Sequence, residues 1–544
     1  MGEVERLGEL DRRELLKRLG AASAALSLPA LLAACGGDGG AGAGGGDIEE
    51  LTWSLSTTPA TLDVATGFSS DGMLAMRLGL ETLLVTGDDL ALKPQLATSW
   101  SHPDPLTYVY ELRRGVRFWD GTPLTAEDVA WSLGRHADPK VGSQIAGYYG
   151  SVESVEATGG HQVTVRLKQP DALFQYVPVF SFVTPKALGE RLGRKLGVPG
   201  SRVATMGTGP YRIVSFSGEG SLTAERNPRY WGPRPRARRV ILRTIEKEQT
   251  ALLAMRAGDV DGRFEYSPAQ AADWDRLPAA STAYAPGLRI VYLSFDVSSP
   301  PWDDVHVRRA VAHAADREGY VKAFLGGRAR AATAVASPEQ WASIATPADI
   351  DALYSRLPGY DYDIEAAKRE LAQSRHPDGF AATIVYPSEN TPVGRALVSL
   401  SQALKPLGID LTVREVTQAA WVAGIYAHEN MGLYYMSLSP TYADPANYLA
   451  LIYPSANAVR NSFNTANFRN ATVDRLLHEQ AASVDRDVRA RALGDILQIS
   501  GEELPYLPLW WQDTPMAIRS TYDYDGFNSL YYQQAWPEQV QVHA

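Results

Sequence analysis

The sequence has few of the residues that cross-link a chain or bind metals. Cys35 is the only cysteine among 544 residues, so no disulfide can join two parts of this chain. The nine histidines are scattered, and no two have the spacing of metal ligands. The G-x-S-x-G, H-E-x-x-H and phosphate-loop motifs are missing as well. These absences argue against a hydrolase or a histidine-bound metal, and they leave hydrophobic cores to stabilise the fold.

Long apolar runs and a basic stripe are also missing. Beyond the first 34 residues, no apolar run is long enough to span a membrane. The net charge is −10, and an acidic chain without a basic stripe argues against nucleic-acid binding. Hydrophobic residues make up 45% of the chain and aromatic residues 9%, which is enough to fill more than one core.

The N-terminal region has the features of an export signal. Residues 1–34 combine a charged flank, an apolar stretch at 19–34 and small residues just before Cys35. Residues 32–35 (LAAC) resemble a bacterial lipobox, the motif whose cysteine is lipidated. Arg12 and Arg13 resemble a twin-arginine signal, with general secretory export as the alternative. We therefore expect a signal peptide and a lipid on Cys35 rather than a buried helix with a structural cysteine.

A glycine-rich segment at 35–46 follows and predicts a flexible tether, with the folded body beginning near Asp47. Alternating residues at 107–112 predict a strand, for which 113–118 is the expected hairpin partner. Thr125, with Asp128 three residues later, predicts a capped helix start. Further helices are expected at 249–257, 305–315, 366–372, 395–407, 472–482 and 487–499, and strands at 163–167, 290–295, 382–386, 411–416 and 433–436. This mixture predicts an α/β fold with two lobes.

Several motifs recur in the order seen in one protein family. The densest is RRGVRFWDGTPLTAEDV at 113–129. The others are 207–211 (GTGPY), 227–232 (NPRYWG), 258–261 (GDVD), 301–310 (PWDDVHVRRA) and 316–318 (DRE). The chain thereby resembles family 5 of the bacterial extracellular solute-binding proteins, the peptide- and nickel-binding receptors of ABC importers. Turn and cap chemistry explains these motifs, so they identify the fold and not the ligand. Asp304 and Arg308, four apart on a helix, have the spacing of an ion pair.

The resemblance implies a two-lobed periplasmic-binding-protein fold with hinge crossovers and an extra subdomain inserted in lobe one. The expected limits are 47–297 for lobe one with the insertion at about 84–205, 298–500 for lobe two, and 501–544 for the return to lobe one. The hinge is expected near 288–296 and 504–511.

The same resemblance implies how the protein works. We expect an extracytoplasmic, lipid-anchored monomer that closes on a small polar solute, with a peptide-like one favoured. It would deliver that solute to the permease of an ABC importer, with no cofactor, no metal and no nucleic acid. A secreted lipoprotein hydrolase, and a sensing or chaperone receptor on the same fold, are the alternatives.

The resemblance also points to ligand contacts. In peptide-binding relatives, an aspartate three residues after a tryptophan pairs with the peptide's α-amino group. Here Leu438 takes the place of that tryptophan and Thr441 that of the aspartate, whereas Asp444 keeps the position before a proline. A hydroxyl cannot neutralise a buried ammonium, which argues against free-amino peptides. Asp444 is either a substitute anion or a turn residue.

Arg395 matches the position at which dipeptide-binding relatives clamp the ligand's carboxylate, and a guanidinium suits that role. The alternative is a solvated arginine at a helix end. The remaining candidate ligand contacts are Phe68, Ser69, Ser70, Tyr148, Trp421, Tyr434, Tyr435 and Tyr442, each of which is equally suited to core packing. Alternation allows only one of Tyr434 and Tyr435 to face the cleft. Together, Thr441 and Arg395 favour an acidic or amine-blocked peptide, while oligosaccharides and metal chelates stay open.

Overall fold

The computed structural model describes residues 46–200, 205–429 and 431–543. The expected signal peptide, the lipidation of Cys35 and nearly all of the tether lie outside these residues. The described residues belong to one compact unit. No helix in the described residues is long and apolar enough to cross a membrane.

One large mixed sheet runs through this unit. Its nine strands follow the order β16-β12-β17-β11-β1-β10-β9-β8, and β13 pairs with β17 beside this path. The strands are β1 (Ile48–Leu55), β8 (Tyr211–Ser217), β9 (Ser221–Arg226), β10 (Ala237–Thr244), β11 (Gly262–Phe264), β12 (Ala280–Phe295), β13 (Ala329–Ala331), β16 (Leu433–Leu438) and β17 (Tyr506–Arg519). β1 and β10 pair in parallel, whereas β12 pairs antiparallel with β16 and β17.

Two large hydrophobic cores divide the unit into lobes. Lobe one packs the strands from β1 to β11 and the chain beyond β17 around Trp53, Phe264 and Trp536. Its helices are α2 (Ser70–Gly79), α3 (Ala126–Gly134), α4 (Lys186–Leu192), α5 (Glu248–Ala257), α6 (Ala271–Asp275) and α16 (Trp536–Gln539). A small separate core around Trp274 joins α5 and α6.

A four-stranded antiparallel sheet of order β4-β5-β7-β6 belongs to lobe one. Its strands are β4 (Ala97–Asp104), β5 (Thr107–Leu112), β6 (Val152–Gly159) and β7 (Gln162–Leu167), and the short pairs β2 (Leu84–Thr86) with β3 (Leu92–Pro94) and β18 (Tyr522–Tyr524) with β19 (Val540–Val542) lie outside it. Between β5 and β6, α3 begins at the expected capping box, in which Asp128 N donates to Thr125 Oγ1 at 3.2 Å and Thr125 N to Asp128 Oδ2 at 3.0 Å.

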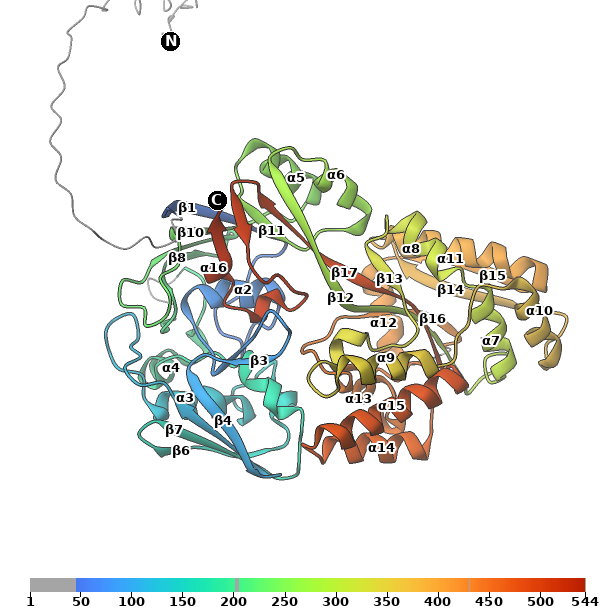
Figure 1. Cartoon of the computed structure of the whole chain (residues 1–544), viewed down its shortest axis with the longest axis horizontal. Helices are drawn as coiled ribbons and strands as arrows, with labels where there is room; N and C mark the ends of the chain where they lie inside the picture. Colours follow the sequence, from blue (N-terminus) through green and yellow to red (C-terminus); the bar gives the residue numbers. More distant parts are fainter. Residues whose placement is uncertain (1–45, 201–204, 430, 544) are drawn as a thin grey trace, which may run out of the picture. The chain divides into compact units, whose positions relative to one another are not determined.

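Lobe two contains most of the helices drawn on the right in Figure 1, in yellow to red. They are α7 (Val305–Ala314), α8 (Arg317–Phe324), α9 (Pro347–Arg356), α10 (Ile364–Gln373), α11 (Thr391–Leu404), α12 (Gln418–Ala427), α13 (Ala446–Ile452), α14 (Ala471–Ala481) and α15 (Arg486–Glu503). The parallel strands β14 (Ala381–Pro387) and β15 (Asp410–Val416) pack with α11 against the hydrophobic core of lobe two.

The long strands β12 and β17 run from one lobe to the other (Figure 1). Their ends at 290–295 and 506–511 belong to the core of lobe two, while Met516 and Ile518 belong to that of lobe one. The pairing shifts register between Ala285 and Arg289. At that shift the backbones are so close that a Cβ on Gly287 would lie 1.7 Å from the carbonyl oxygen of Gln512. Any other residue would therefore push the two crossing strands apart.

Two local expectations are wrong. Residues 113–118 form no hairpin with β5, whose partners are β4 and β7. Asp304 does not pair with Arg308. It caps α7 by accepting from His306 N at 2.9 Å, and its other oxygen accepts from Arg375 N at 2.8 Å. The limits expected for the two lobes stay predictions.

Candidate functional site

A cavity of about 570 Å³ lies between the lobes at the crossing of β12 and β17. Lobe one contributes Ser56, Glu246, Glu248, Arg263, Glu265, Tyr266, Ser267 and Pro268. Arg289 and Gln512 come from the crossing strands, and lobe two contributes Pro387, Glu389, Asn390, Pro392, Gln418, Trp421, Tyr435, Ser437 and Ser439. Its volume suits a small solute.

The two guanidinium groups in this lining are already engaged. Arg263 is buried, and its Nη1 donates to Ser54 Oγ at 2.8 Å and to the carbonyl oxygen of Ile245 at 3.2 Å. Burial lowers its pKa from the usual value. Arg289 Nε donates to Ser439 Oγ at 2.9 Å, and Arg289 Nη2 lies 3.6 Å from Glu265 Oε2. Arg263 is therefore committed to the fold, whereas Arg289 keeps 38% of its side-chain surface exposed beside Glu265.

Carboxylates outnumber these cations around the cavity. Glu265 is shared with Arg289. Glu248 accepts from Ser267 N at 2.7 Å, and burial raises the pKa of its carboxyl above the usual value. Glu246 and Glu389 are exposed, and within the described chain neither forms an ion pair. Four carboxyl groups face two guanidinium groups, so the cavity carries negative charge.

Aromatic side chains form the wall on lobe two. Trp421 and Tyr435 line the cavity, and Trp421 Nε1 donates to the carbonyl oxygen of Tyr435 at 3.1 Å. Asn390 Nδ2 donates to Tyr435 Oη at 2.6 Å and holds the ring in place. Tyr434 is not in the lining, and its hydroxyl donates to the carbonyl oxygen of Trp421 at 2.8 Å. Burial raises the pKa of both tyrosines to about 12, so both act as neutral groups.

Away from this cavity the two lobes are in direct contact at Thr441, the residue that takes the place of the amine-binding aspartate. The hydroxyls of Tyr148 in lobe one and Thr441 in lobe two lie 2.9 Å apart. Gln533 donates to the carbonyl oxygen of Thr441. Phe68 packs beside Tyr148, with ring centroids 6.2 Å apart, and its N donates to Gln144 Oε1 at 2.8 Å. The protein's own groups therefore satisfy Thr441.

Asp444 forms a buried ion pair instead of facing the cavity. Its Oδ1 lies 2.9 Å from Arg489 Nη2, with side-chain exposures of 0% and 1%. Tyr176 from lobe one donates its hydroxyl to Asp444 Oδ2 at 3.0 Å. Tyr442 stacks on Tyr176 with centroids 4.8 Å apart, and burial raises the pKa of both hydroxyls. This network joins the lobes and holds the 441–444 loop.

The other candidates occupy varied places. Ser69 is the N-cap of α2, accepting from Gly72 N at 3.1 Å, and the half-buried Ser70 is the first residue of that helix. Leu438 is half-buried at the end of β16. Arg395 is exposed on α11 and is absent from the cavity lining. As ligand contacts these residues stay predictions.

Sequence reasoning missed most of the polar lining. Ser437 could have been predicted, because alternation along β16 places its side chain on the same face as that of Tyr435. Arg263, Glu265 and Glu389 carried no comparable signal, since a three-residue strand and two loop positions have no periodicity from which the facing side could be predicted.

Comparisons with known proteins agree with this architecture. Residues 91–459 match the model of the bacterial extracellular solute-binding proteins, family 5 Middle. The glutathione-binding protein GsiB of Escherichia coli (strain K12) is 27% identical over 430 residues, which cover 77% of this chain and 81% of GsiB.

Solved structures are similar over most of the chain. The periplasmic binding protein DppA from Helicobacter pylori, in complex with the peptide STSA, gives a TM-score of 0.72 at 22% identity, covering 92% of this chain and 99% of DppA. The substrate-binding protein CtaP from Listeria monocytogenes gives 0.80 at 21% identity, covering 91% and 99%. These similarities confirm the predicted two-lobed fold.

Proposed function

This chain belongs to family 5 of the bacterial extracellular solute-binding proteins, as its motifs predicted, and on that premise we propose that it captures a peptide-like solute for an ABC importer. The observation that supports this most is the cavity of about 570 Å³, walled by both lobes where β12 and β17 cross. The relatives reported above are solute-binding proteins and not enzymes, which supports a binding role. Delivery to a membrane permease completes the proposal.

Capture would work through contacts that exist only when the lobes meet. The Tyr148–Thr441 and Tyr176–Asp444 hydrogen bonds each join the two lobes. A solute held between Trp421 and Glu265 would touch both lobes as well, and so stabilise the same closed state. A hinge in the crossing strands would then separate a closed, loaded form from an open, empty one.

The charge of the cavity bears on the class of solute. Four carboxyl groups against two engaged guanidinium groups favour a ligand with a cationic group at this end of the cleft. At the other contact region Thr441 and its partner Tyr148 present hydroxyls rather than a carboxylate to a free α-amino group. We therefore propose a peptide-like solute with a basic side chain, and the acidic ligand suggested by Arg395 finds no support in this lining.

A melting-temperature screen of the body from Gly46 onward should identify ligands. N-acetylated basic peptides should raise the melting temperature more than acidic ones, with glutathione, oligosaccharides and metal chelates as further probes. A ligand at about 100 times its dissociation constant stabilises by about 2.7 kcal/mol. Small-angle scattering should show a smaller radius of gyration with the same ligand. Tight binding of unmodified dipeptides would contradict our interpretation of Thr441, and substrate turnover without closure would favour a hydrolase.

We also propose that the protein is exported and lipidated at Cys35. Replacing Cys35 by Ala should move it from the membrane fraction to the soluble fraction, because the lipid would be its anchor. Retention of Cys35→Ala in the membrane would contradict the anchor. Changing both Arg12 and Arg13 to Lys should reduce export if the twin-arginine route is used, and undiminished export would indicate general secretion.

A further inference from the structure

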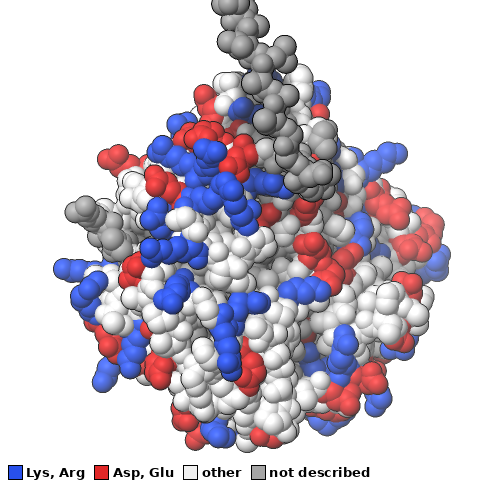
Figure 2. All heavy atoms as spheres, turned by 60° about the vertical axis from the view of Figure 1, so that its left-hand side comes forward, with Lys and Arg blue, Asp and Glu red and all other residues white. Residues whose placement is uncertain are grey.

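An arginine-rich face surrounds the start of the described chain. It consists of Arg226, Arg229, Arg234, Arg236, Arg238 and Arg239, and no acidic residue occurs between 226 and 239. These residues lie at the end of β9, in the following loop and at the start of β10. Figure 2 shows Lys and Arg side chains gathered on this side of a molecule whose net charge is −10.

The carboxylates of Asp47 and of the start of β1 neutralise only part of this charge. Asp47 lies 3.0 Å from Arg226, 2.7 Å from Arg234 and 3.2 Å from Arg238. Glu49 and Glu50 contact the arginine face at 3.5 and 3.6 Å. Asp47 and Glu49 are thus two carboxylates shared among three guanidinium groups, those of Arg226, Arg234 and Arg238. Arg234 and Arg238 keep 68% and 56% of their side-chain surface exposed, so the excess charge is open to solvent.

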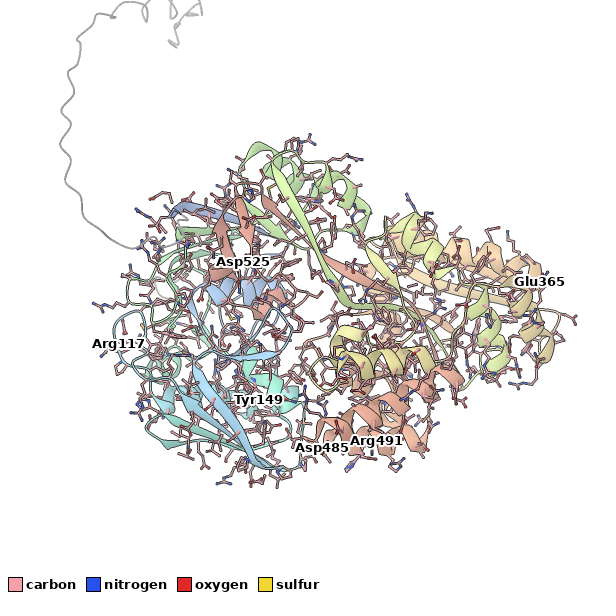
Figure 3. All side chains as sticks on the ribbon, in the orientation of Figure 1. Arg117, Tyr149, Glu365, Asp485, Arg491 and Asp525 are labelled. Atoms are coloured by element: carbon pink, nitrogen blue, oxygen red, sulfur yellow. The ribbon has the colours of Figure 1, made fainter. Side chains whose placement is uncertain are left out.

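The arginine face contains a cavity, and further arginine side chains lie at its edge. A cavity of about 390 Å³ is lined by Arg226, Arg234 and Tyr230 with neighbouring residues of the loop. Arg229 reaches the turn at Gly121, where a Cβ would lie 2.6 Å from its Nη1. Arg117 donates to the carbonyl oxygen of Gly121 at 2.8 Å and projects outward at the left of Figure 3. Guanidinium groups around a hollow suit phosphate oxygens, which they bind in pairs.

The position of the arginine face near the start of the described chain indicates which surface it binds. Gly46 continues directly into Asp47, whose carboxylate is held by three of these arginines. Cys35 stands eleven residues before Gly46 in the sequence, and an extended chain of that length reaches at most about 40 Å. A lipid on Cys35 would therefore keep the arginine face close to a membrane. The opposite charges of anionic headgroups and arginines would then attract over about one Debye length.

We propose that the arginine face docks on an anionic lipid surface. The orientation toward the membrane rests on the proposed lipid anchor, whereas the affinity rests on the charge of the face alone. The two can therefore fail separately, because a body without Cys35 still carries the arginines.

Vesicle sedimentation tests this with the unlipidated body from Gly46 onward, which contains all the cores described above. It should bind phosphatidylglycerol-containing vesicles at least about tenfold more tightly than phosphatidylcholine vesicles at low ionic strength, and lose that binding in about 1 M salt. Arg234→Glu with Arg238→Glu should abolish the preference. The matched control is Arg369→Glu with Arg475→Glu on lobe two, whose side chains are 66% and 63% exposed and whose net charge change is the same.

Three outcomes would overturn the proposal: equal binding to both vesicle types, equal loss in both double variants, or a preference for duplex DNA over anionic vesicles at the same salt. Circular dichroism and melting temperature would verify that each variant is folded. Solute binding measured on the same samples should stay unchanged, because neither pair lies in the cavity between the lobes.

Discussion

Replacing Arg489 by Met should lower the free energy of unfolding by about 3–5 kcal/mol, the usual cost of breaking a buried ion pair. The change would leave the Asp444 carboxylate buried, with only the hydroxyl of Tyr176 and Ala446 N as hydrogen-bond donors to its oxygens in the described structure. Asp444→Asn should also destabilise the protein, because the guanidinium of Arg489 loses its counter-charge. The loss should be smaller than in Arg489→Met, because the new amide oxygen can still accept the hydrogen bond from Arg489. Urea unfolding followed by circular dichroism would measure both changes.

Arg475→Gln is the matched control for this measurement. Arg475 lies 3.0 Å from Glu479 on α14, but their side chains are 63% and 46% exposed. An exposed pair four residues apart contributes only about 0.3–0.5 kcal/mol. A loss in Arg489→Met as small as that in Arg475→Gln would show that water reaches the Asp444 pair. It would also remove our reason for inferring that this network holds the 441–444 loop.

Local chemistry was enough to predict many elements. The Thr125–Asp128 capping box, the strand at 107–112 and the helix at 487–499 follow from spacing and periodicity within a few residues. The hairpin expected at 113–118 is wrong because alternation predicts a strand without naming its partner. β5 pairs with β7, about fifty residues later in the chain, and no local pattern specifies such a contact.

The site was less predictable for the same reason. Tyr148 and Thr441 were both named as candidates, but their contact joins residues 293 positions apart. Alternation allowed only one of Tyr434 and Tyr435 to face the cleft but did not show which, and Tyr435 is the one in the lining of the cavity. Whether Arg263 would serve a ligand or the fold depended on Ser54 and the carbonyl oxygens around it, which only the assembled lobe brings together.

The charge of the cavity can be tested by reversing it at one position. Glu389 is exposed, lines the cavity and forms no ion pair within the described chain, so Glu389→Lys changes the charge with little effect on packing. A unit charge about 4 Å away contributes about 1 kcal/mol in water and about 4 kcal/mol at a partly buried protein site. The change reverses the sign at Glu389 and the two peptides differ in sign as well, so four such terms enter the ratio of their dissociation constants. The ratio for an N-acetylated lysine peptide and its glutamate analogue should therefore shift by at least about 100-fold toward the glutamate peptide.

Isothermal titration of both peptides against both proteins would measure this ratio. Glu365→Lys is the matched control, because Glu365 is 71% exposed on α10, lies far to the right in Figure 3 and is absent from the cavity lining. It changes the net charge by the same amount, so a shift caused only by the overall field of the protein would appear in both variants. A ratio that moves in Glu389→Lys alone would mean that the solute's charged group binds beside Glu389. An unchanged ratio would mean that it binds at another part of the cleft, and Arg395 on α11 would then become the next position to test.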